Sequence, residues 1–334
     1  MQVLVSGATG FIGAYTVKAL HDAGRTVRAT VRSEGSKERA WAGLESIGLE
    51  GAREHVELVV ATLDDDAGWA AAMEGVECVH HVASPVPVEQ PKDKMEIVRP
   101  ARDGALRALR AAREAGVRRV VLTSSVAAVA GAPGKAGKKH FGADDWTDLS
   151  PPSPTPYVES KTVAERAARD FAAEGGPELV TVNPGLVMGP LVAGRVNASN
   201  EIVKRLVKGE MPMLPRLSFE CVDVRDVADL HVLAMDRAED GDRLMATNGL
   251  FWMEDVAATL REGLTAEEAQ KVPTRRAPDL LIRFLGLFDG GTRTIAALLG
   301  QERTFDNGPS LALGWTPRDP RESILETARG VLAA

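Results

Sequence analysis

The glycine-rich segment that follows the first apolar run constrains the fold most strongly. "QVLVSGATGFIGAY" places Gly7, Gly10 and Gly13 between a strand-like run and a helical pattern that stops at Gly24. Glycines at such a turn let the backbone approach a pyrophosphate, and the helix N-terminus offers free N–H groups and a positive dipole end. A purely structural turn is the alternative, but the position between strand and helix favours dinucleotide binding.

The rest of the N-terminal half repeats this alternation of strand and helix. Apolar runs of strand length occupy residues 25–32, 55–63, 78–84, 118–125 and 178–185. Such runs, separated by helix-sized segments, predict a parallel sheet covered on both faces, with right-handed crossovers. We therefore predict an α/β fold with a Rossmann-type, doubly wound parallel sheet.

The pattern changes after Gly185, where Pro, Gly and Met become frequent. We predict that residues 1–185 form the dinucleotide-binding domain and that a helix within 222–240 returns to it. Residues 186–221 and 241–334 are predicted to form a smaller C-terminal substrate-binding lobe. Met211, Met213 and Phe219 either line a pocket in this lobe or belong to its core.

Composition narrows the expected partners and location. The chain of 334 residues has a formal net charge of −7 and lacks a long basic run, so nucleic acid is not an expected partner. No apolar run reaches the roughly 18 residues of a spanning helix, and a strand that begins near Gln2 leaves no room for a signal peptide. Cys78 and Cys221 suit small core positions and predict neither a disulfide framework nor a metal site. A cytoplasmic protein is expected, and a homodimer is the expected assembly.

Two other groups of polar residues have structural explanations. His80 and His81 are neighbours in a predicted strand and point to opposite faces, so they cannot easily share one metal ion. Packing, or a place beside the cofactor, is expected for them. The three acids at 64–66 are expected to mark a helix N-terminus, where carboxylates cap backbone N–H groups.

Arg32 at the end of the second predicted strand bears on the choice of dinucleotide. NAD sites usually place a carboxylate there, about 20 residues beyond the glycines, to bind the ribose 2′-hydroxyl. This chain has Arg32, 19 residues after Gly13, and its guanidinium suits a 2′-phosphate. Lys37 and Arg39 offer a second cation. A solvated surface arginine is the alternative, but the position favours NADP.

Tyr157 and Lys161 form a candidate acid–base pair. They stand at i and i+4 of a predicted helix that follows Pro154 and Pro156, so both side chains project from one face. A phenol has a pKa of about 10, which a nearby ammonium lowers, so the pair is expected to act as a tuned general acid/base. Such a pair also occurs by chance in many helices.

A serine pair supplies the third element of the candidate site. Ser124 and Ser125 end the fifth predicted strand, in "VVLTSSVAAV". A hydroxyl there can hold a substrate carbonyl oxygen beside the phenol, and we choose Ser125 because it directly precedes the small apolar run. The glycine cradle, serine pair and Tyr–Lys pair in this order are far more specific together than any one of them alone.

Together these motifs resemble the extended short-chain dehydrogenase/reductases over essentially the whole chain. The resemblance is carried by "SGATGFIG", "VHHVASP", "VRRVVLTSS", "TPYVESK", "VTVNPGLVMGP" and "LGWTPR". The most similar branch contains plant dihydroflavonol and cinnamoyl-CoA reductases, yeast methylglyoxal reductase and bacterial aldehyde reductases, and the Ala- and Arg-rich helices favour a bacterial source.

The resemblance also implies which residues form the site. It makes Ser125, Tyr157 and Lys161 the catalytic residues, and Tyr157 and Lys161 contact the cofactor as well. The other implied contacts to NADP(H) are Gly7, Thr9, Gly10, Phe11, Ile12, Gly13, Arg32, Lys37, Leu63, Ala83, Ser84, Pro184 and Val187.

Three departures from the family pattern bear on cofactor and substrate. Thr62–Leu63 stands where the family has Asp–Leu, which puts an adenine contact in doubt. Ala130 replaces the polar residue that meets the flavonoid in dihydroflavonol reductases. "TPYVESK" lacks the aromatic and cysteine-containing signature of cinnamoyl-CoA reductases. A generic aldehyde or ketone is therefore the expected substrate.

The predicted function is NADPH-dependent reduction of an aldehyde or ketone to an alcohol, with Tyr157 as general acid. One alternative is a non-catalytic NADP-binding sensor on the same fold, which would normally have lost the tyrosine or the lysine. A nucleotide-sugar epimerase or dehydratase is the other alternative. That chemistry needs tightly held NAD and usually an acidic end to the second strand, which Arg32 contradicts.

Overall fold

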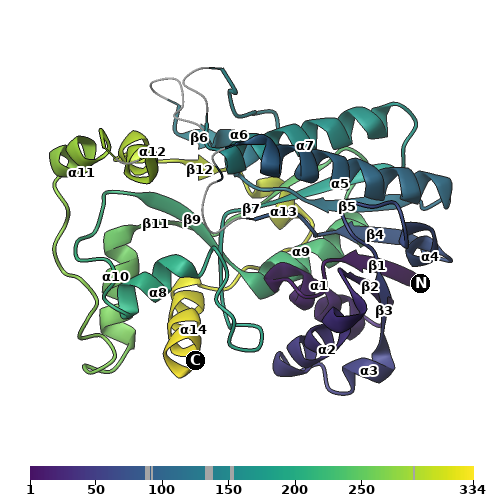
Figure 1. Ribbon diagram of the computed structural model, residues 1–334, viewed down its shortest axis with the longest axis horizontal. Coiled ribbons are helices and arrows are strands. Elements are labelled where there is room, and N and C mark those ends of the chain that lie inside the picture. Colours follow the sequence, from purple (N-terminus) through teal and green to yellow (C-terminus); the bar gives the residue numbers. More distant parts are fainter. Residues whose placement is uncertain (87–90, 92, 132–137, 151–153, 289) are drawn as a thin grey trace.

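A seven-stranded parallel sheet organises the computed structural model, which describes residues 1–86, 91, 93–131, 138–150, 154–288 and 290–334. The strand order is β10-β7-β5-β4-β1-β2-β3, and every neighbouring pair is parallel. The strands are β1 (Gln2–Ser6), β2 (Thr26–Val31), β3 (Val56–Val60), β4 (Cys78–His81), β5 (Arg119–Thr123), β7 (Glu178–Pro184) and β10 (Arg243–Ala246). The predicted Rossmann-type sheet is confirmed (Figure 1).

Helices cover both faces of this sheet because successive strand residues point to opposite sides. Val3 and Val5 of β1 face α1 (Phe11–Asp22) and α9 (Val224–Arg237). Leu4 lies in a separate core with α4 (Trp69–Met73), α5 (Met95–Glu114) and α7 (Pro156–Ala173). Helix α5 packs closely on α7 because small residues, including Ala101, Ala105 and Ala108, recur along its buried face. The outer edge beside β2 and β3 carries α2 (Lys37–Ser46) and α3 (Ala52–His55).

The C-terminal half builds a second, smaller body around its own core. Its three-stranded sheet has the order β11-β9-β8. Its core contains Val203, Val256 and Leu260, all fully buried. The elements of this lobe are β8 (Leu186–Met188), α8 (Glu201–Val207), β9 (Ser218–Asp223), β11 (Leu250–Trp252), α10 (Met253–Gly263), α11 (Asp279–Leu285), α12 (Gly290–Leu298) and α14 (Pro320–Ala333). A separate two-stranded parallel sheet joins β6 (His140–Phe141) from the first half of the chain to β12 (Thr304–Phe305) from the second half. Two further short helices are α6 (Ala127–Ala130) and α13 (Gly308–Ala312).

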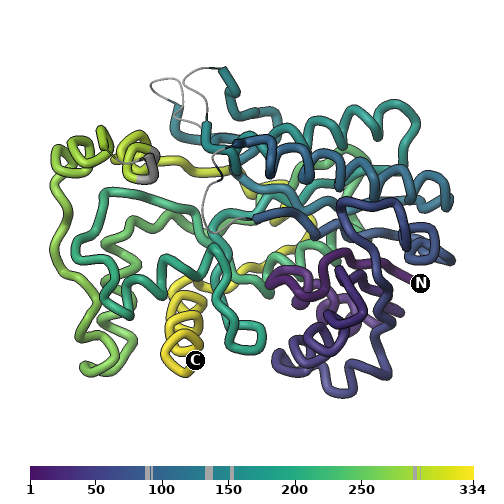
Figure 2. The backbone as a smooth tube through the Cα atoms, in the orientation of Figure 1, coloured from purple at the N-terminus to yellow at the C-terminus, as the bar shows by residue number. Residues whose placement is uncertain are grey.

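Two segments of the predicted C-terminal lobe, β10 (Arg243–Ala246) and the segment around Trp315, belong to the large sheet instead. Strand β10 lies within 241–334, yet it pairs in parallel with β7 and forms the edge of the large sheet. Trp315 also packs into the core of the large sheet, where its indole N–H donates to the carbonyl oxygen of Asp226 at 2.8 Å. Figure 2 follows the chain from the sheet into the lobe and back. The chain therefore crosses between the two bodies more often than the simple division predicts.

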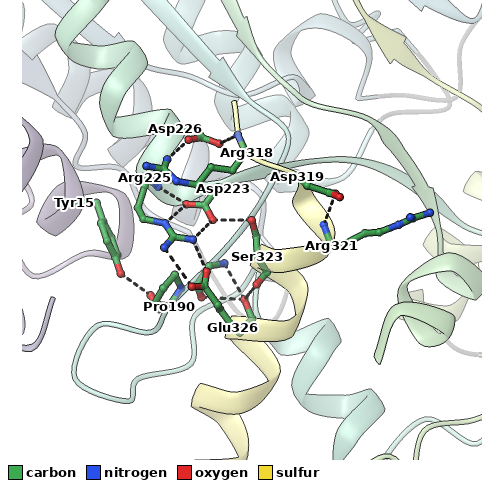
Figure 3. A network of polar contacts seen from close by, with 12 residues as sticks. Tyr15, Pro190, Asp223, Arg225, Asp226, Arg318, Asp319, Arg321, Ser323 and Glu326 are labelled. Atoms are coloured by element: carbon green, nitrogen blue, oxygen red, sulfur yellow. Dashed lines mark hydrogen bonds and ion pairs between the residues drawn. The ribbon is translucent and has the colours of Figure 1, made fainter. Parts of the chain in front are cut away.

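A polar network fastens α14 to the start of α9 (Figure 3). The Asp223 carboxylate is fully buried and accepts hydrogen bonds from Arg225 at 2.7 and 2.8 Å and from the Ser323 hydroxyl at 2.6 Å. Arg225 also pairs with Glu326 of α14. The last helix is thus attached to the end of β9, which leads directly into the large sheet's α9.

Across the described residues, no helix is long and apolar enough to cross a membrane.

Candidate active site

The glycine turn has the shape of a phosphate cradle. Gly7 has a φ of 82°, a backbone conformation that favours glycine. A β-carbon on Gly13 would lie 2.2 Å from the carbonyl oxygen of Gly7, so no larger residue fits there without moving the backbone. Gly10 is the N-cap residue of α1, and no side chain caps its first turn. The N–H groups at the start of α1 are therefore available to an anion, and the turn fits the pyrophosphate of a dinucleotide.

The end of β4 closes the other side of this turn. A β-carbon on Gly7 would come within 3.2 Å of Ala83, so the two segments are in close contact. The Ser6 hydroxyl accepts the N–H of Ala83 at 2.9 Å and lies 3.0 Å from Nδ1 of His81. Ser84 follows as a half-buried residue. Ala83 and Ser84 thus lie beside the cradle, as the resemblance implies, although their contact with a cofactor stays a prediction.

Arg32 stands directly after β2, where the prediction placed it. Its side chain is exposed, and within the described ranges it makes no ion pair. Lys37, at the start of α2, instead pairs with Glu34 at 2.9 Å. Arg39 is exposed and reaches only the Ser36 hydroxyl, at 3.4 Å. Arg32 is therefore the cation best placed and least engaged for a 2′-phosphate.

The segment after β3 has a mainly structural role in this structure. The carbonyl oxygen of Thr62 accepts the indole N–H of Trp69 at 2.8 Å. Leu63 packs against Gly104 of α5, where a β-carbon would come within 2.9 Å of it. The three acids at 64–66 do not begin a helix, so that expectation is wrong: α4 begins later, at Trp69, after the N-cap residue Gly68. Asp66 pairs instead with Arg107 of α5.

The two histidines lie on opposite faces of the sheet, as predicted. His80 is fully buried and its Nδ1 lies 3.4 Å from Nδ1 of His231 on α9. His81 faces Trp69 on the other side, with ring centroids 6.2 Å apart. Burial and, second to it, the charge of Lys161 lower the pKa of His81 to about 4. His81 is therefore neutral near pH 7 and sits beside the candidate catalytic lysine.

The structure brings together the three predicted catalytic side chains. Helix α7 begins at Pro156, and the Thr155 hydroxyl caps it by accepting the N–H of Val158 at 3.3 Å. This start places Tyr157 in the first turn, where its phenol is near enough to the Ser125 hydroxyl for that hydroxyl to lower the pKa of the phenol. Lys161 follows one turn later and is 6% exposed. Tyr157 and Ser125 line one cavity of about 450 Å³.

The ionisation of the Tyr–Lys pair differs from the prediction. Burial raises the pKa of the Tyr157 phenol above 10.0, and the hydrogen bond with Ser125 opposes this increase only in part. Burial also lowers the pKa of Lys161 to about 8, which the Glu165 carboxylate partly offsets. The expected lowering of the Tyr157 pKa by Lys161 is wrong here, because burial dominates at the phenol, and the lysine's charge lowers the pKa of His81 instead. The phenol is thus protonated near neutral pH, as a proton donor must be.

Glu165 is an important residue that the sequence reading missed. It is fully buried one turn beyond Lys161, and it accepts hydrogen bonds from the Ser124 hydroxyl and from Nδ2 of Asn183, the latter at 2.8 Å. Nε of Arg243 on β10 donates to it at 2.6 Å. Ser124 is therefore engaged by Glu165, whereas Ser125 faces the phenol. The i, i+8 spacing from Tyr157 was the available signal, since it places Glu165 on the same helix face.

The wall of the cavity comes from several distant segments. Its apolar part includes Ala127, Ala130, Leu186, Phe219 and Phe305, and its ionisable part includes Glu220 and Arg303. Phe219 is thus a pocket residue, whereas Met211 and Met213 pack on the core of the lobe. Glu220, Arg303 and Phe305 carry no local motif, so only the folded chain identifies them.

The segment after β7 continues this wall. Pro184 is the last residue of β7, and its carbonyl oxygen accepts the N–H of Val126 at 3.0 Å. Val187 is 4% exposed and packs into the core of the large sheet. Their proposed contact with the nicotinamide stays a prediction. Among the described residues, no group of three or more His, Cys, Asp and Glu side chains is arranged to hold a metal ion.

Several known proteins are similar to this chain in sequence and in fold. The model of the NAD dependent epimerase/dehydratase family matches residues 3–247. Cinnamoyl-CoA reductase CAD2 of Medicago truncatula is 35% identical over 78% of this chain and 80% of its own. Dihydroflavonol 4-reductase of Zea mays is 31% identical over 78% of this chain and 73% of its own. The structure of yeast methylglyoxal/isovaleraldehyde reductase Gre2 complexed with NADPH superposes on this chain with a TM-score of 0.80 and 28% sequence identity. The superposition covers 100% of this chain and 98% of the Gre2 chain.

A Rossmann sheet with this cradle and this cavity is typical of enzymes that use a nicotinamide dinucleotide. The chain belongs to the extended short-chain dehydrogenase/reductases, in the branch that contains plant cinnamoyl-CoA and dihydroflavonol reductases.

Proposed function

We propose that the protein is an NADPH-dependent reductase that converts an aldehyde or ketone into an alcohol. The observation that carries this proposal is that Tyr157 and Ser125 line the same largely apolar cavity. A protonated phenol beside a second hydroxyl suits a substrate oxygen that gains negative charge. The carbonyl reductases among the relatives support the same reaction type.

NADPH, when bound, supplies a hydride to the carbonyl carbon. The electron pair of the C=O bond then moves onto oxygen, where the Ser125 hydroxyl donates a hydrogen bond. Tyr157 gives its phenolic proton to that oxygen, so the product is a neutral alcohol. Lys161, one helical turn further along α7, would donate to the ribose hydroxyls of the bound cofactor. The apolar wall excludes water, which strengthens these polar contacts.

The cradle of Gly7, Gly10 and Gly13 holds the pyrophosphate in this proposal, and the N–H groups of α1 face it. Thr9, Phe11, Ile12, Leu63, Ala83, Ser84, Pro184 and Val187 are proposed as further cofactor contacts. Arg32 favours NADPH over NADH, because it follows β2 and has no acidic partner among the described residues. The NADPH bound to yeast Gre2 supports this choice.

A nucleotide-sugar epimerase is the second candidate, because the matching family is described by that activity. An epimerase returns the hydride to its substrate and so keeps its NAD bound. Assays of the purified protein separate the two: the proposed reductase consumes NADPH in proportion to the aldehyde or ketone supplied. NAD that co-purifies with the protein, with no net NADPH consumption on any carbonyl compound tested, would favour the epimerase.

A non-catalytic sensor is the third candidate, and a different result is expected for it. It would bind NADPH with measurable affinity and never consume it. The retained Ser125, Tyr157 and Lys161 argue for catalysis instead.

A further inference from the structure

Arg303 is an unusual member of the cavity wall. It precedes β12 and shares the cavity with Tyr157 and Ser125. Its Nη1 donates to the carbonyl oxygen of Ala130 at 2.6 Å, and its Nη2 donates to the side chain of Gln301. Both acceptors are neutral, so these contacts orient the guanidinium without compensating its charge.

No acidic partner balances this cation within the described part of the chain. Arg303 makes no ion pair there, and burial alone lowers its pKa. The neighbouring acid, Glu302, pairs instead with Lys139 at 2.5 Å. A partly buried guanidinium without a counter-charge is costly, and an anion that enters the cavity would relieve that cost.

Glu220 is the other ionisable group of the cavity, and it does not fill this role. Its carboxyl is 9% exposed and accepts the N–H of Phe305 at 3.3 Å. Burial raises its pKa, while the hydrogen bond from the Phe305 N–H partly opposes the increase. Glu220 is thus shifted towards its neutral form and forms no salt bridge with Arg303.

The guanidinium is held at a fixed place relative to the catalytic serine. Ala130, which anchors it, ends the short helix α6 that begins just after Ser125. The N–H of Ala128 donates to the Ser125 carbonyl at 3.0 Å, so this segment is helical from the serine onward. Five residues of helix rise about 7.5 Å, which separates the anchor of the cation from the serine by several bond lengths.

We infer that the substrate is a carbonyl compound that also carries a carboxylate, bound by Arg303 while its carbonyl meets Ser125 and Tyr157. This inference rests on the proposed reductase function. A carboxylate suits the site better than a phosphate because one planar guanidinium matches its two oxygens, and no second cation lines the described part of the cavity. The separation along α6 favours a carboxylate several bonds from the carbonyl over an α-keto acid.

A matched pair of substrates tests this inference. NADPH consumption is measured with hexanal and with the same six-carbon aldehyde ending in a carboxylate. We expect kcat/KM to favour the acid by about 10- to 100-fold, the range of a charge-assisted hydrogen bond. Arg303→Gln should abolish that preference by raising the KM of the acid, with hexanal changed only a few-fold. Arg303→Lys, which keeps the charge, should retain part of the preference and replaces the Gln variant if that one does not fold.

Arg205→Gln is the control, since it removes an exposed positive charge of α8 outside the cavity. It should leave the preference intact. Equal wild-type efficiency with both aldehydes, or equal losses for both in Arg303→Gln, would overturn the inference while leaving carbonyl reduction in place.

Calorimetry separates failure of the inference from failure of the proposed function. The protein is titrated with hexanoate and with hexanol in the presence of NADP⁺. Stronger binding of hexanoate to the wild type than to Arg303→Gln supports the anion site even if no aldehyde is reduced. Equal binding of hexanoate to the two proteins would overturn it.

Discussion

At the scale of single residues, the proposed reaction depends on one proton donor, the phenol of Tyr157. The chain has two tyrosines, and Tyr15 is engaged elsewhere, donating to the carbonyl oxygen of Pro190 at 3.1 Å. Tyr157→Phe keeps the ring and removes the proton donor, so kcat/KM should fall by about 10²–10⁴. Folding and NADPH affinity should survive, which a melting curve and a fluorescence titration check. Turnover near that of the wild type would reject Tyr157 as the general acid.

Lys161 leads to a prediction about pH. Burial lowers its pKa to about 8, so the ammonium is present below that pH and is lost as the pH rises through it. Because kcat/KM reports the free enzyme, kcat/KM for reduction should be level near pH 7 and should decline above about pH 8. Lys161→Arg, whose charge persists at high pH, should remove this decline while lowering the maximum. A profile for the wild type that stays level to pH 10 would contradict the proposed role of the ammonium.

The site residues that the sequence predicts lie in local patterns, whereas those that it does not predict depend on contacts between distant elements. Gly7, Gly13, Tyr157 and Lys161 form local patterns, since each pattern lies within one turn or one helix and can be read from spacing alone. Glu165 and Arg303 have partners on other elements, β10 for the first and α6 for the second. Only tertiary contacts give such residues their environment. Helix spacing places Glu165 on the face of Tyr157 but does not reveal its partners, and no spacing rule along the chain points to Arg303.

At the scale of elements, the turn from β2 into α2 carries the choice of cofactor. Arg32 follows the strand directly, and Lys37 is paired with Glu34. If Arg32 binds the 2′-phosphate, Arg32→Asp should reverse the preference from NADPH to NADH, with a loss of about 10- to 100-fold in NADPH efficiency. The change should appear mainly in the cofactor KM, because the phosphate contributes uniform binding.

Steady-state kinetics with both cofactors measure this change, and Arg53→Gln, which removes an exposed positive charge of α3, serves as the control. Equal use of NADH and NADPH by the wild type would show that Arg32 is only a surface charge.

The elements themselves were largely predictable. The six expected strands of the large sheet all form, because each is a mostly apolar run, and the inner strands β1, β4, β5 and β7 are buried on both faces. Strand β10 escaped prediction because it has only four residues and begins with a buried arginine, Arg243, whose charge Glu165 balances.

At the scale of the whole molecule, the two bodies are joined by the returning chain. The substrate cavity draws Ser125 and Tyr157 from the large sheet and Phe219 and Arg303 from later segments. Its shape therefore depends on how firmly the C-terminal region is attached. The network of Asp223, Arg225 and Ser323 provides one such attachment (Figure 3).

Asp223→Asn tests the weight of that attachment. Burial raises the pKa of Asp223, but the hydrogen bonds from Arg225 and Ser323 outweigh it and leave the pKa below 3.8. Removing the buried negative charge leaves Arg225 with only Glu326, so the free energy of unfolding should fall by roughly 3 kcal/mol at pH 7. Asp22→Asn, which breaks an exposed pair with Lys18, should cost no more than about 0.5 kcal/mol.

The pH dependence of this difference gives the sharper test. A carboxyl whose pKa is lowered by folding stabilises the protein above its unfolded pKa, here 3.8, and loses that contribution as the pH falls through the lower folded value. The gap in unfolding free energy between the wild type and Asp223→Asn should therefore be constant near neutral pH and narrow below about pH 4. Urea unfolding of both proteins at several pH values measures it. A gap that stays constant into strong acid would mean that Asp223 acts through packing, and that its charge does not hold α14 to the rest of the molecule.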